Sequence, residues 1–342
     1  MNNPVLEHVT KSARHTGFYL SCGAETATPI IFVHGWPELS ISWRHQLAMF
    51  AGLGFRPIAP DMRGYGRSSV YPRHEDYCQE EIVADMIELL DALGAEKAVW
   101  VGHDLGAPVV WSIAQHHPER CHCIANLCVP YIPEGFAVEA LLPLADRTLY
   151  PEDRFPAAQW DYQMFYRENF AAASAGFEAD TRATVRALFR AGDPAAKGRR
   201  AVTAHTRAMG GFFGPGQPAP AMPRDETVIS EVDENRFVAA LEATGFFGAD
   251  SWYMNGPANI AYAARAKANW RLPMPVLFLH AAYDYICETI DSRLPEPMRA
   301  HCANLTEAVV DSGHWMAQEK PERVNAELAK WLAVQLPGAF RG

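Results

Sequence analysis

The cysteines of this sequence lack the spacing that would mark them as disulfide partners or zinc ligands. The 342 residues include seven cysteines, an odd number, and no C-x-x-C motif. Cys121 and Cys123 alternate in the way that strand residues do, which is not typical of a zinc site. We therefore predict reduced thiols in a cytoplasmic enzyme, with no metal site.

Long apolar runs and an excess of basic residues are also absent. No segment has the roughly 20 apolar residues that a membrane-spanning helix needs, and the first ten residues, MNNPVLEHVT, contain no apolar signal-peptide core. Forty acidic residues against 30 basic ones give a net charge of −10, which argues against nucleic acid or an anionic membrane as a partner. The apolar content of 49% is enough for the large core of a globular protein.

Apolar runs and amphipathic patterns alternate over the first 128 residues. They predict strands at 18–21, Pro29–Val33, 55–60, 98–101 and 123–128, with helices from residue 42 to about 52 and at 80–93. The pattern resumes with strands at 275–279 and 305–310 and a closing helix at 321–334. Apolar strands that alternate with helices form parallel sheets, so we predict an α/β fold with a doubly wound, mostly parallel sheet.

The alternation stops at Pro130. From residue 131 to about residue 269 the sequence shows only short helical patterns and a Gly/Pro-rich stretch at 210–223, which is typical of a surface excursion or lid loop. We therefore predict a core domain formed by residues 1–130 and 270–342. A mostly helical cap domain, the lid, is predicted at residues 131–269, inserted into that core.

A sharp turn is predicted directly after the strand at 98–101. Gly102 and Gly106 lie two residues before and two residues after Asp104, and an apolar helix follows. This is the pattern of a G-x-S-x-G nucleophile elbow with Asp in place of Ser. Asp tolerates the positive φ that such a turn imposes, and a helix N-terminus favours an anion. We therefore predict that Asp104 is a nucleophile.

Two further polar residues follow predicted strands in the order of a hydrolase triad. Asp284 and His314 come after the strands at 275–279 and 305–310, and nucleophile, acid, then histidine is the chain order of that class. Carboxyl ends of parallel strands meet at one edge of a sheet, where ligands bind. Each residue alone would be an ordinary loop residue, but together they predict a catalytic triad. His34 and His103 are predicted to be structural hydrogen-bonding residues.

The identity of the nucleophile restricts the chemistry. A carboxylate that attacks a saturated carbon forms an ester, which water can cleave, whereas a serine would form an inert ether. Asp104 therefore indicates epoxides or alkyl halides as substrates. His314, oriented by Asp284, would activate the water for the second step.

The tetrahedral intermediate of that second step needs an oxyanion hole. By the logic of the elbow, one backbone N–H comes from Leu105 and the other from Trp36, in the turn after the strand Pro29–Val33. Pro37 has no N–H, and a cis bond at this residue would stiffen the turn.

Four motifs together resemble the soluble epoxide hydrolases of the α/β-hydrolase superfamily, and the likeness covers nearly the whole chain. The motifs are His34-Gly35-Trp36-Pro37-Glu38, Asp61-Met62-Arg63-Gly64-Tyr65-Gly66-Arg67-Ser68, Gly102-His103-Asp104-Leu105-Gly106-Ala107 and Asp311-Ser312-Gly313-His314-Trp315. The resemblance implies an α/β-hydrolase fold with an inserted helical cap. The sequence departs from the family at Leu105, where Trp is common, and at Met254, where Arg is common.

The resemblance also implies two cap tyrosines that donate hydrogen bonds to the epoxide oxygen. By the match of motifs these are Tyr162, in Asp161-Tyr162-Gln163-Met164-Phe165, and Tyr253, in Trp252-Tyr253-Met254-Asn255. Tyr166, one helical turn further on, is the alternative for the first role. An alkoxide is a poor leaving group and needs such donors. The alternative for each of these tyrosines is amphipathic packing, which is the commoner role of a tyrosine.

These observations predict an epoxide hydrolase that converts an epoxide to a vicinal diol through an ester on Asp104. No cofactor is expected, the partners are a small apolar or amphiphilic epoxide and water, and a homodimer is left open. A haloalkane or haloacid dehalogenase of the same fold is the nearest alternative. Leu105 cannot hold a halide or a carboxylate there, although Trp36 could still donate to a halide. A catalytically idle homologue that binds a small ligand is the alternative of another class.

Overall fold

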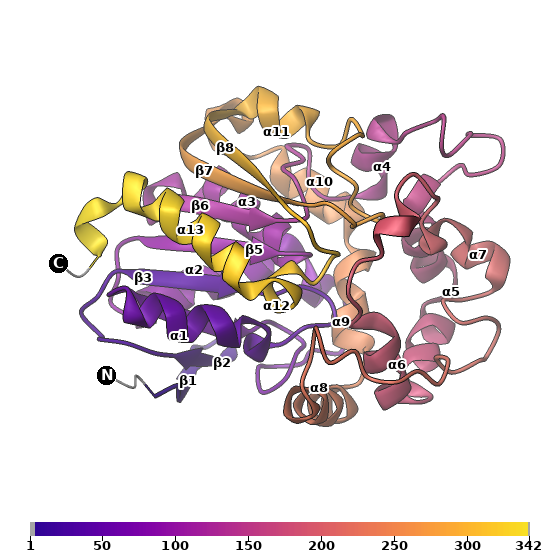
Figure 1. The fold of residues 1–342 in the computed structure, drawn as a ribbon, viewed down its shortest axis with the longest axis horizontal. Helices are drawn as coiled ribbons and strands as arrows, with labels where there is room; N and C mark the ends of the chain where they lie inside the picture. The colour runs from indigo at the N-terminus through magenta and orange to yellow at the C-terminus, as the bar shows by residue number, and fades with distance from the viewer. Residues whose placement is uncertain (1–3, 341–342) are drawn as a thin grey trace.

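The computed structural model describes residues 4–340, which form an eight-stranded sheet with helices on both faces (Figure 1). The strand order is β1-β2-β4-β3-β5-β6-β7-β8. Only the pairs β1–β2 and β2–β4 are antiparallel. The strands are β1 (Leu6–Lys11), β2 (Thr16–Ser21), β3 (Pro29–Val33), β4 (Arg56–Asp61), β5 (Ala98–His103), β6 (Cys121–Leu127), β7 (Leu272–Ala281) and β8 (Cys302–Val310). The predicted doubly wound, mostly parallel sheet is confirmed.

The central strands are largely apolar because helices cover both faces of the sheet. Every residue of β3 and β5 is buried, as expected for parallel strands between two helical layers. Helices α1 and α13 contact each other on one face, and α2 contacts α3 on the other (Figure 1). The core helices are α1 (Arg44–Gly52), α2 (Gln79–Ala92), α3 (Gly106–His116), α11 (Glu296–His301), α12 (Met316–Glu319) and α13 (Pro321–Gln335).

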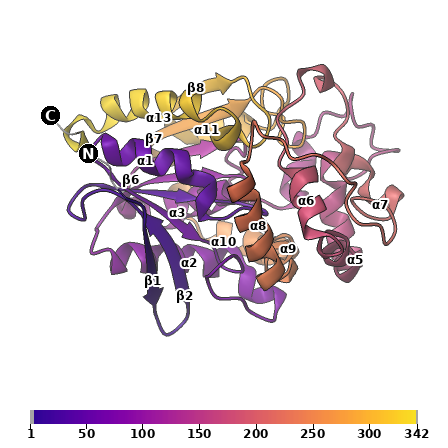
Figure 2. The same cartoon turned by 60° about the horizontal axis from the view of Figure 1, so that its bottom comes forward.

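The predicted strands lie within a few residues of the observed ones, but the sequence pattern misses β1. This strand lies at the edge of the sheet beside β2 (Figure 2). Four of its six residues are exposed, the other two are half-buried, and none is fully buried. An edge strand has a partner on one side only and covers little of the core, so it shows no apolar run.

All residues between β6 and β7 lie in helices, turns or loops, and we call the segment 128–271 the insert. Most of it lies to the right of the sheet in Figure 1. Its helices are α4 (Val138–Leu141), α5 (Asp161–Glu178), α6 (Thr181–Leu188), α7 (Thr206–Met209), α8 (Glu231–Thr244), α9 (Phe247–Ser251) and α10 (Gly256–Ala263). The predicted boundaries at 130 and 270 lie within a few residues of the ends of the insert, and the division into two domains remains a prediction.

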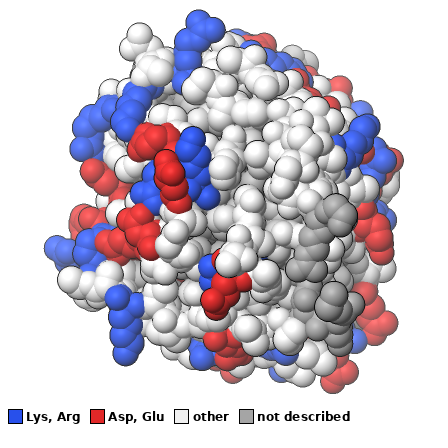
Figure 3. Space-filling view, turned by 90° about the vertical axis from the view of Figure 1, so that its left-hand side faces the viewer, with Lys and Arg blue, Asp and Glu red and all other residues white. Residues whose placement is uncertain are grey.

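The charged side chains do not form a large patch of one sign on the face of the molecule that Figure 3 shows. Acidic and basic residues are intermixed there around a neutral area. Among residues 4–340, no helix is long and apolar enough to cross a membrane.

Candidate active site

The turn between β5 and α3 has the geometry that its glycines predict. Asp104 adopts a φ of 51°. A Cβ atom on Gly102 would lie 2.5 Å from Asn126 Oδ1, and a Cβ atom on Gly106 would overlap the carbonyl oxygen of Val33. Neighbouring strands therefore leave no room for side chains on either side of Asp104. Its carboxylate projects from a tight turn at the end of β5.

A second turn, after β3, approaches the same carboxylate. The backbone N–H of Trp36 donates to Asp104 Oδ1 at 2.6 Å. The backbone nitrogen of Leu105 lies beside it, since a Cβ atom on Gly35 would be 2.5 Å from that nitrogen. The Trp36–Pro37 peptide bond is cis. The structure thus brings the two predicted oxyanion-hole residues to Asp104.

The structure also brings together the three residues of the predicted triad. His314 Nε2 lies 3.2 Å from Asp104 Oδ2, and His314 Nδ1 lies 2.6 Å from Asp284 Oδ2. Asp284 is buried, and its Oδ1 accepts hydrogen bonds from two backbone N–H groups. Burial alone would lower the pKa of His314, but the Asp284 carboxylate and the hydrogen bonds to both aspartates raise that pKa well above its ordinary value. Burial opposes ionisation of Asp284, yet His314 lowers the pKa of this carboxyl group.

A buried ion pair holds the main chain of His314, and its acidic partner was missed in the sequence. His103 contacts Glu38 Oε1 through Nδ1 and the His314 carbonyl oxygen through Nε2, both at 2.7 Å. Both ring nitrogens face acceptors, so the ring carries both protons. Burial acts against this charge, but Glu38 raises the pKa of His103 well above its ordinary value. Burial would raise the pKa of Glu38, whereas His103 lowers it to about 2.

His34 and His103 both have hydrogen-bond partners, as predicted for structural histidines. Nδ1 of His34 donates to the Gly35 carbonyl oxygen at 2.9 Å, and Nε2 accepts from the backbone N–H of Met62. Among residues 4–340, one cluster of possible metal ligands is present, formed by His103, Cys128 and His314. Their donor atoms lie within 4.8 Å of one another. The ring nitrogens of both histidines already have hydrogen-bond partners, so this cluster belongs to the network around His314.

Three tyrosines of the insert lie together opposite the triad. Tyr162 and Tyr166 lie on α5, and Tyr253 lies on the 3₁₀ helix η8 (Trp252–Met254). The ring centroid of Tyr253 is 5.4 Å from that of Tyr162 and 5.0 Å from that of Tyr166, which is stacked on it at 7°. Burial raises the pKa of all three phenols, so they are protonated at neutral pH.

The hydroxyl groups of Tyr162 and Tyr166 have different partners. Tyr166 donates to Asp250 Oδ1 at 3.1 Å, so its proton is committed to that carboxylate. The hydroxyl oxygen of Tyr162 accepts from Gln163 Nε2 at 3.2 Å. Asp250 is a second buried acid that sequence reasoning missed. Its position three residues before Tyr253 could have indicated that it lies near the site.

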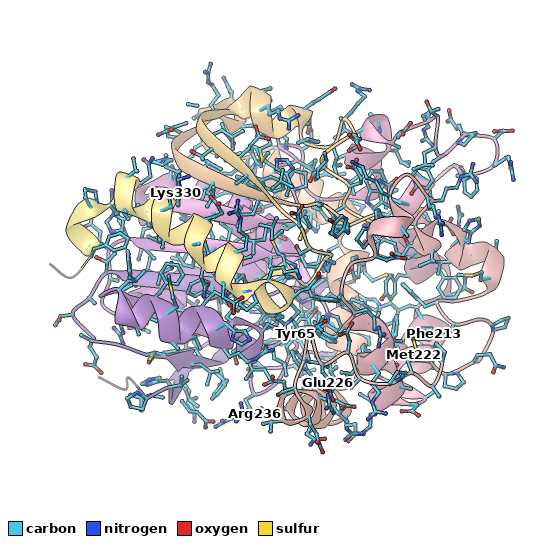
Figure 4. All side chains as sticks on the ribbon, in the orientation of Figure 1. Tyr65, Phe213, Met222, Glu226, Arg236 and Lys330 are labelled. Atoms are coloured by element: carbon cyan, nitrogen blue, oxygen red, sulfur yellow. The ribbon has the colours of Figure 1, made fainter. Side chains whose placement is uncertain are left out.

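A cavity of about 580 Å³ connects these groups. It is large enough for a small organic ligand. Asp104, Asp284 and His314 lie on its core side. The aromatic residues that line it are Trp36, Phe136, Tyr162, Tyr166, Phe212, Phe213, Tyr253, Tyr283, Tyr285 and Trp315. Six of these ten aromatic residues come from the insert, among them Phe213, which is labelled in Figure 4. Phe212 and Phe213 come from the predicted lid loop at 210–223.

The family model of the alpha/beta hydrolase fold matches residues 28–321. Bifunctional epoxide hydrolase 2 of Sus scrofa is 30% identical over 308 residues, which is 89% of this chain and 51% of the relative. The chain therefore spans about half the length of this relative. Epoxide hydrolase A of Mycobacterium tuberculosis is 32% identical over 315 residues, which is 92% of each chain.

Solved structures show the same similarity. Epoxide Hydrolase A from Mycobacterium thermoresistibile superposes with a TM-score of 0.77 at 29% identity, covering 96% of this chain and 98% of that one. An epoxide hydrolase from an endophytic Streptomyces gives a TM-score of 0.79 at 28% identity, covering 97% of this chain and 96% of that one. The chain belongs to the α/β-hydrolase fold family. Its resemblance to the epoxide hydrolases within that family is confirmed by these relatives.

Proposed function

We propose that this protein is an epoxide hydrolase, which opens an epoxide by attack of Asp104 and releases a vicinal diol. The observation that carries the proposal is the nucleophilic carboxylate at the elbow, which shares a cavity with His314 and with buried, protonated tyrosines. A carboxylate forms a cleavable ester with a saturated carbon, and ring opening needs a proton donor. The relatives that carry the name epoxide hydrolase support this reading.

In the first step, a carboxylate oxygen of Asp104 attacks an epoxide carbon and the carbon–oxygen bond breaks. We assign Tyr162 and Tyr253 as the donors to the departing oxygen. Tyr166 is the less suitable first donor because its O–H already binds Asp250. The products of this step are an alkyl ester on Asp104 and a free hydroxyl group. We further propose that the insert acts as the cap domain, since it supplies all three tyrosines.

In the second step, His314 removes a proton from water, which attacks the ester carbonyl of Asp104. Asp284 orients the imidazole and stabilises the imidazolium that forms. The backbone N–H groups of Trp36 and Leu105 receive the negative charge of the tetrahedral intermediate. The ester C–O bond then breaks, and His314 returns its proton to the departing oxygen of the diol. The second proton of the water restores the tyrosine that protonated the first oxygen, so Asp104 is again a carboxylate. None of these steps uses a cofactor or a metal ion.

The hydrogen bonds of Trp36 disfavour the dehalogenase alternative. A halide leaving group needs side-chain N–H donors near the nucleophile. Leu105 has none, and the indole N–H of Trp36 donates to Asp250 Oδ1 at 2.8 Å. An idle ligand-binding homologue would have no need of the complete triad geometry. We keep a small apolar or amphiphilic epoxide as the substrate, and a cytoplasmic location as part of the proposal.

Two parallel incubations test the function. The protein is given a styrene-type epoxide in one and a bromoalkane in the other, and diol and bromide are measured. We expect diol from the epoxide and no bromide from the bromoalkane. Bromide release without diol formation would establish a dehalogenase instead. The absence of both products, with ligand binding retained, would establish the idle homologue.

A further inference from the structure

Asp250 is a fully buried carboxylate in the insert that the proposed mechanism does not use. It lies at the end of α9, and the indole N–H of Trp36 and the hydroxyl of Tyr166 both donate to its Oδ1, at 2.8 and 3.1 Å. The hydroxyl of Ser174 donates to Oδ2 at 2.7 Å. The three donors come from two separate parts of the chain, the turn after β3 and the helix α5.

None of the three donors carries a positive charge. The other titratable groups that act on or respond to Asp250 are Glu178, on α5, and Tyr65, which lies where the core meets the insert (Figure 4). Burial raises the pKa of Asp250 to about 7, although its hydrogen bonds act in the opposite direction. Burying a carboxylate without a cation costs free energy. The presence of an acid at this buried position therefore indicates a role beyond packing.

Two of the donors are linked directly to the reacting groups. Trp36 donates its backbone N–H to Asp104 and its indole N–H to Asp250, so this one residue is fixed at both ends. Tyr166 donates to Asp250 while its ring is stacked on the ring of Tyr253. Oδ1 of Asp250 therefore joins the oxyanion hole in the core to the tyrosines of the insert.

We propose that Asp250 is a positioning residue for both halves of the active site. Its carboxylate aligns Trp36, and hence the oxyanion-hole N–H, for hydrolysis of the ester, and it aligns Tyr166 beneath Tyr253 for ring opening. This inference rests on the proposed epoxide hydrolase function. Trp36 is bound to Asp250 directly, whereas Tyr253 is reached through a stacked ring. Hydrolysis of the ester should therefore depend on Asp250 more strongly than ring opening does.

Two substitutions of Asp250 separate the shape of the side chain from its acceptor oxygens. Asp250→Leu keeps a similar volume and removes both acceptors. Complete loss of one oxyanion-hole donor slows turnover by about 10²–10³, so a misaligned donor should slow ester hydrolysis by roughly ten-fold. Asp250→Asn keeps one acceptor for Trp36 and Tyr166, and its amide can donate to the Ser174 hydroxyl. We expect it to restore most of the rate that Asp250→Leu loses.

Ser174→Ala is the matched control. It removes from the same carboxylate a hydrogen bond of similar length that leads to neither Trp36 nor Tyr166. We expect both half-reactions of this variant to stay within about two-fold of the wild-type rates. Trp36→Phe removes the same hydrogen bond to Asp250 by deleting its donor, the indole N–H. This variant takes the place of Asp250→Leu in the test if Asp250→Leu does not fold. It should also slow ester hydrolysis more than ring opening.

The readout is single-turnover kinetics with styrene oxide, in which alkyl-enzyme formation and decay are followed by intact-protein mass spectrometry. The proposal is supported if ester decay slows by roughly ten-fold in folded Asp250→Leu, adduct formation slows less, and Asp250→Asn recovers. It is overturned if ester decay keeps the wild-type rate, or if Ser174→Ala slows it equally. A wild-type protein that forms no adduct and no diol refutes the proposed function, and this inference with it. An active wild type beside an unaffected Asp250→Leu refutes the inference alone.

Discussion

Replacing both Tyr162 and Tyr253 with Phe should abolish epoxide opening and leave the fold intact. The two rings lie 5.4 Å apart between centroids and line the cavity that contains Asp104. Burial raises the pKa of both phenols well above the ordinary value near 10, so both hold their proton at neutral pH. Each hydroxyl is therefore available as the donor that we propose for the oxygen that leaves the attacked carbon.

The expected magnitude follows from what the two hydroxyls do. One donor to a developing oxyanion contributes about 10²–10³ in rate, or about 2.7–4 kcal/mol. A remaining tyrosine can take over part of that role, so each single variant should lose less than this. The double variant has no phenol in place and should slow alkylation by at least about 10³. Removal of the Tyr162 hydroxyl breaks its neutral hydrogen bond with Gln163, and such a loss costs about 1 kcal/mol of stability.

Rapid-quench measurement of the alkyl-enzyme isolates the step. Tyr131→Phe is the matched control, because it makes the same chemical change in a buried tyrosine whose hydroxyl donates to the Trp270 carbonyl oxygen, away from the cavity. Its alkylation rate should equal that of the wild type. A folded double variant that alkylates at the wild-type rate would show that Tyr162 and Tyr253 are packing residues. The reasoning from phenol to ring opening would then be refuted.

Three further results are expected. In ¹⁸O-labelled water with enzyme in excess, the first diol should be largely unlabelled, because the oxygen added to the epoxide comes from the carboxylate of Asp104. Fully labelled diol would mean that water attacks the epoxide directly. His314→Gln should accumulate the alkyl adduct on Asp104, because only the second step needs a base, and mass spectrometry would detect that adduct. A folded variant that hydrolyses the adduct at the wild-type rate would contradict the role of His314 as the base. Gly106→Ala should lower the free energy of unfolding by about 1–3 kcal/mol, measured by denaturant unfolding, because the added Cβ would overlap the Val33 carbonyl oxygen. Gly52→Ala, with nothing within 4 Å of its Cβ position, should be neutral or stabilising.

Seven of the eight strands and the sharp turn at Asp104 could be predicted from the sequence, because both depend on local patterns. Fully buried parallel strands such as β3 and β5 need unbroken apolar runs, and such runs are visible in one segment at a time. The turn at Asp104 needs glycines at fixed offsets, and the structure shows what occupies the space of their missing side chains. Parallel strands align their carboxyl ends, so Asp284 and His314 could also be placed near Asp104. Their distances confirm that the three lie together, and their catalytic roles remain a proposal.

The hydrogen bonds between polar groups of the insert and polar groups of the core could not be predicted from the sequence. Asp250 meets Trp36 over a separation of 214 residues, and no local pattern encodes that contact. This contact occupies the indole N–H of Trp36. Asp250 also accepts the hydroxyl hydrogen bond of Tyr166, and this bond distinguishes Tyr166 from Tyr162. Glu38 lies inside a motif that could be read, but its pairing with His103 depends on how two loops approach each other. Local patterns fix backbone shape, whereas buried hydrogen bonds between distant segments exist only once the chain has folded.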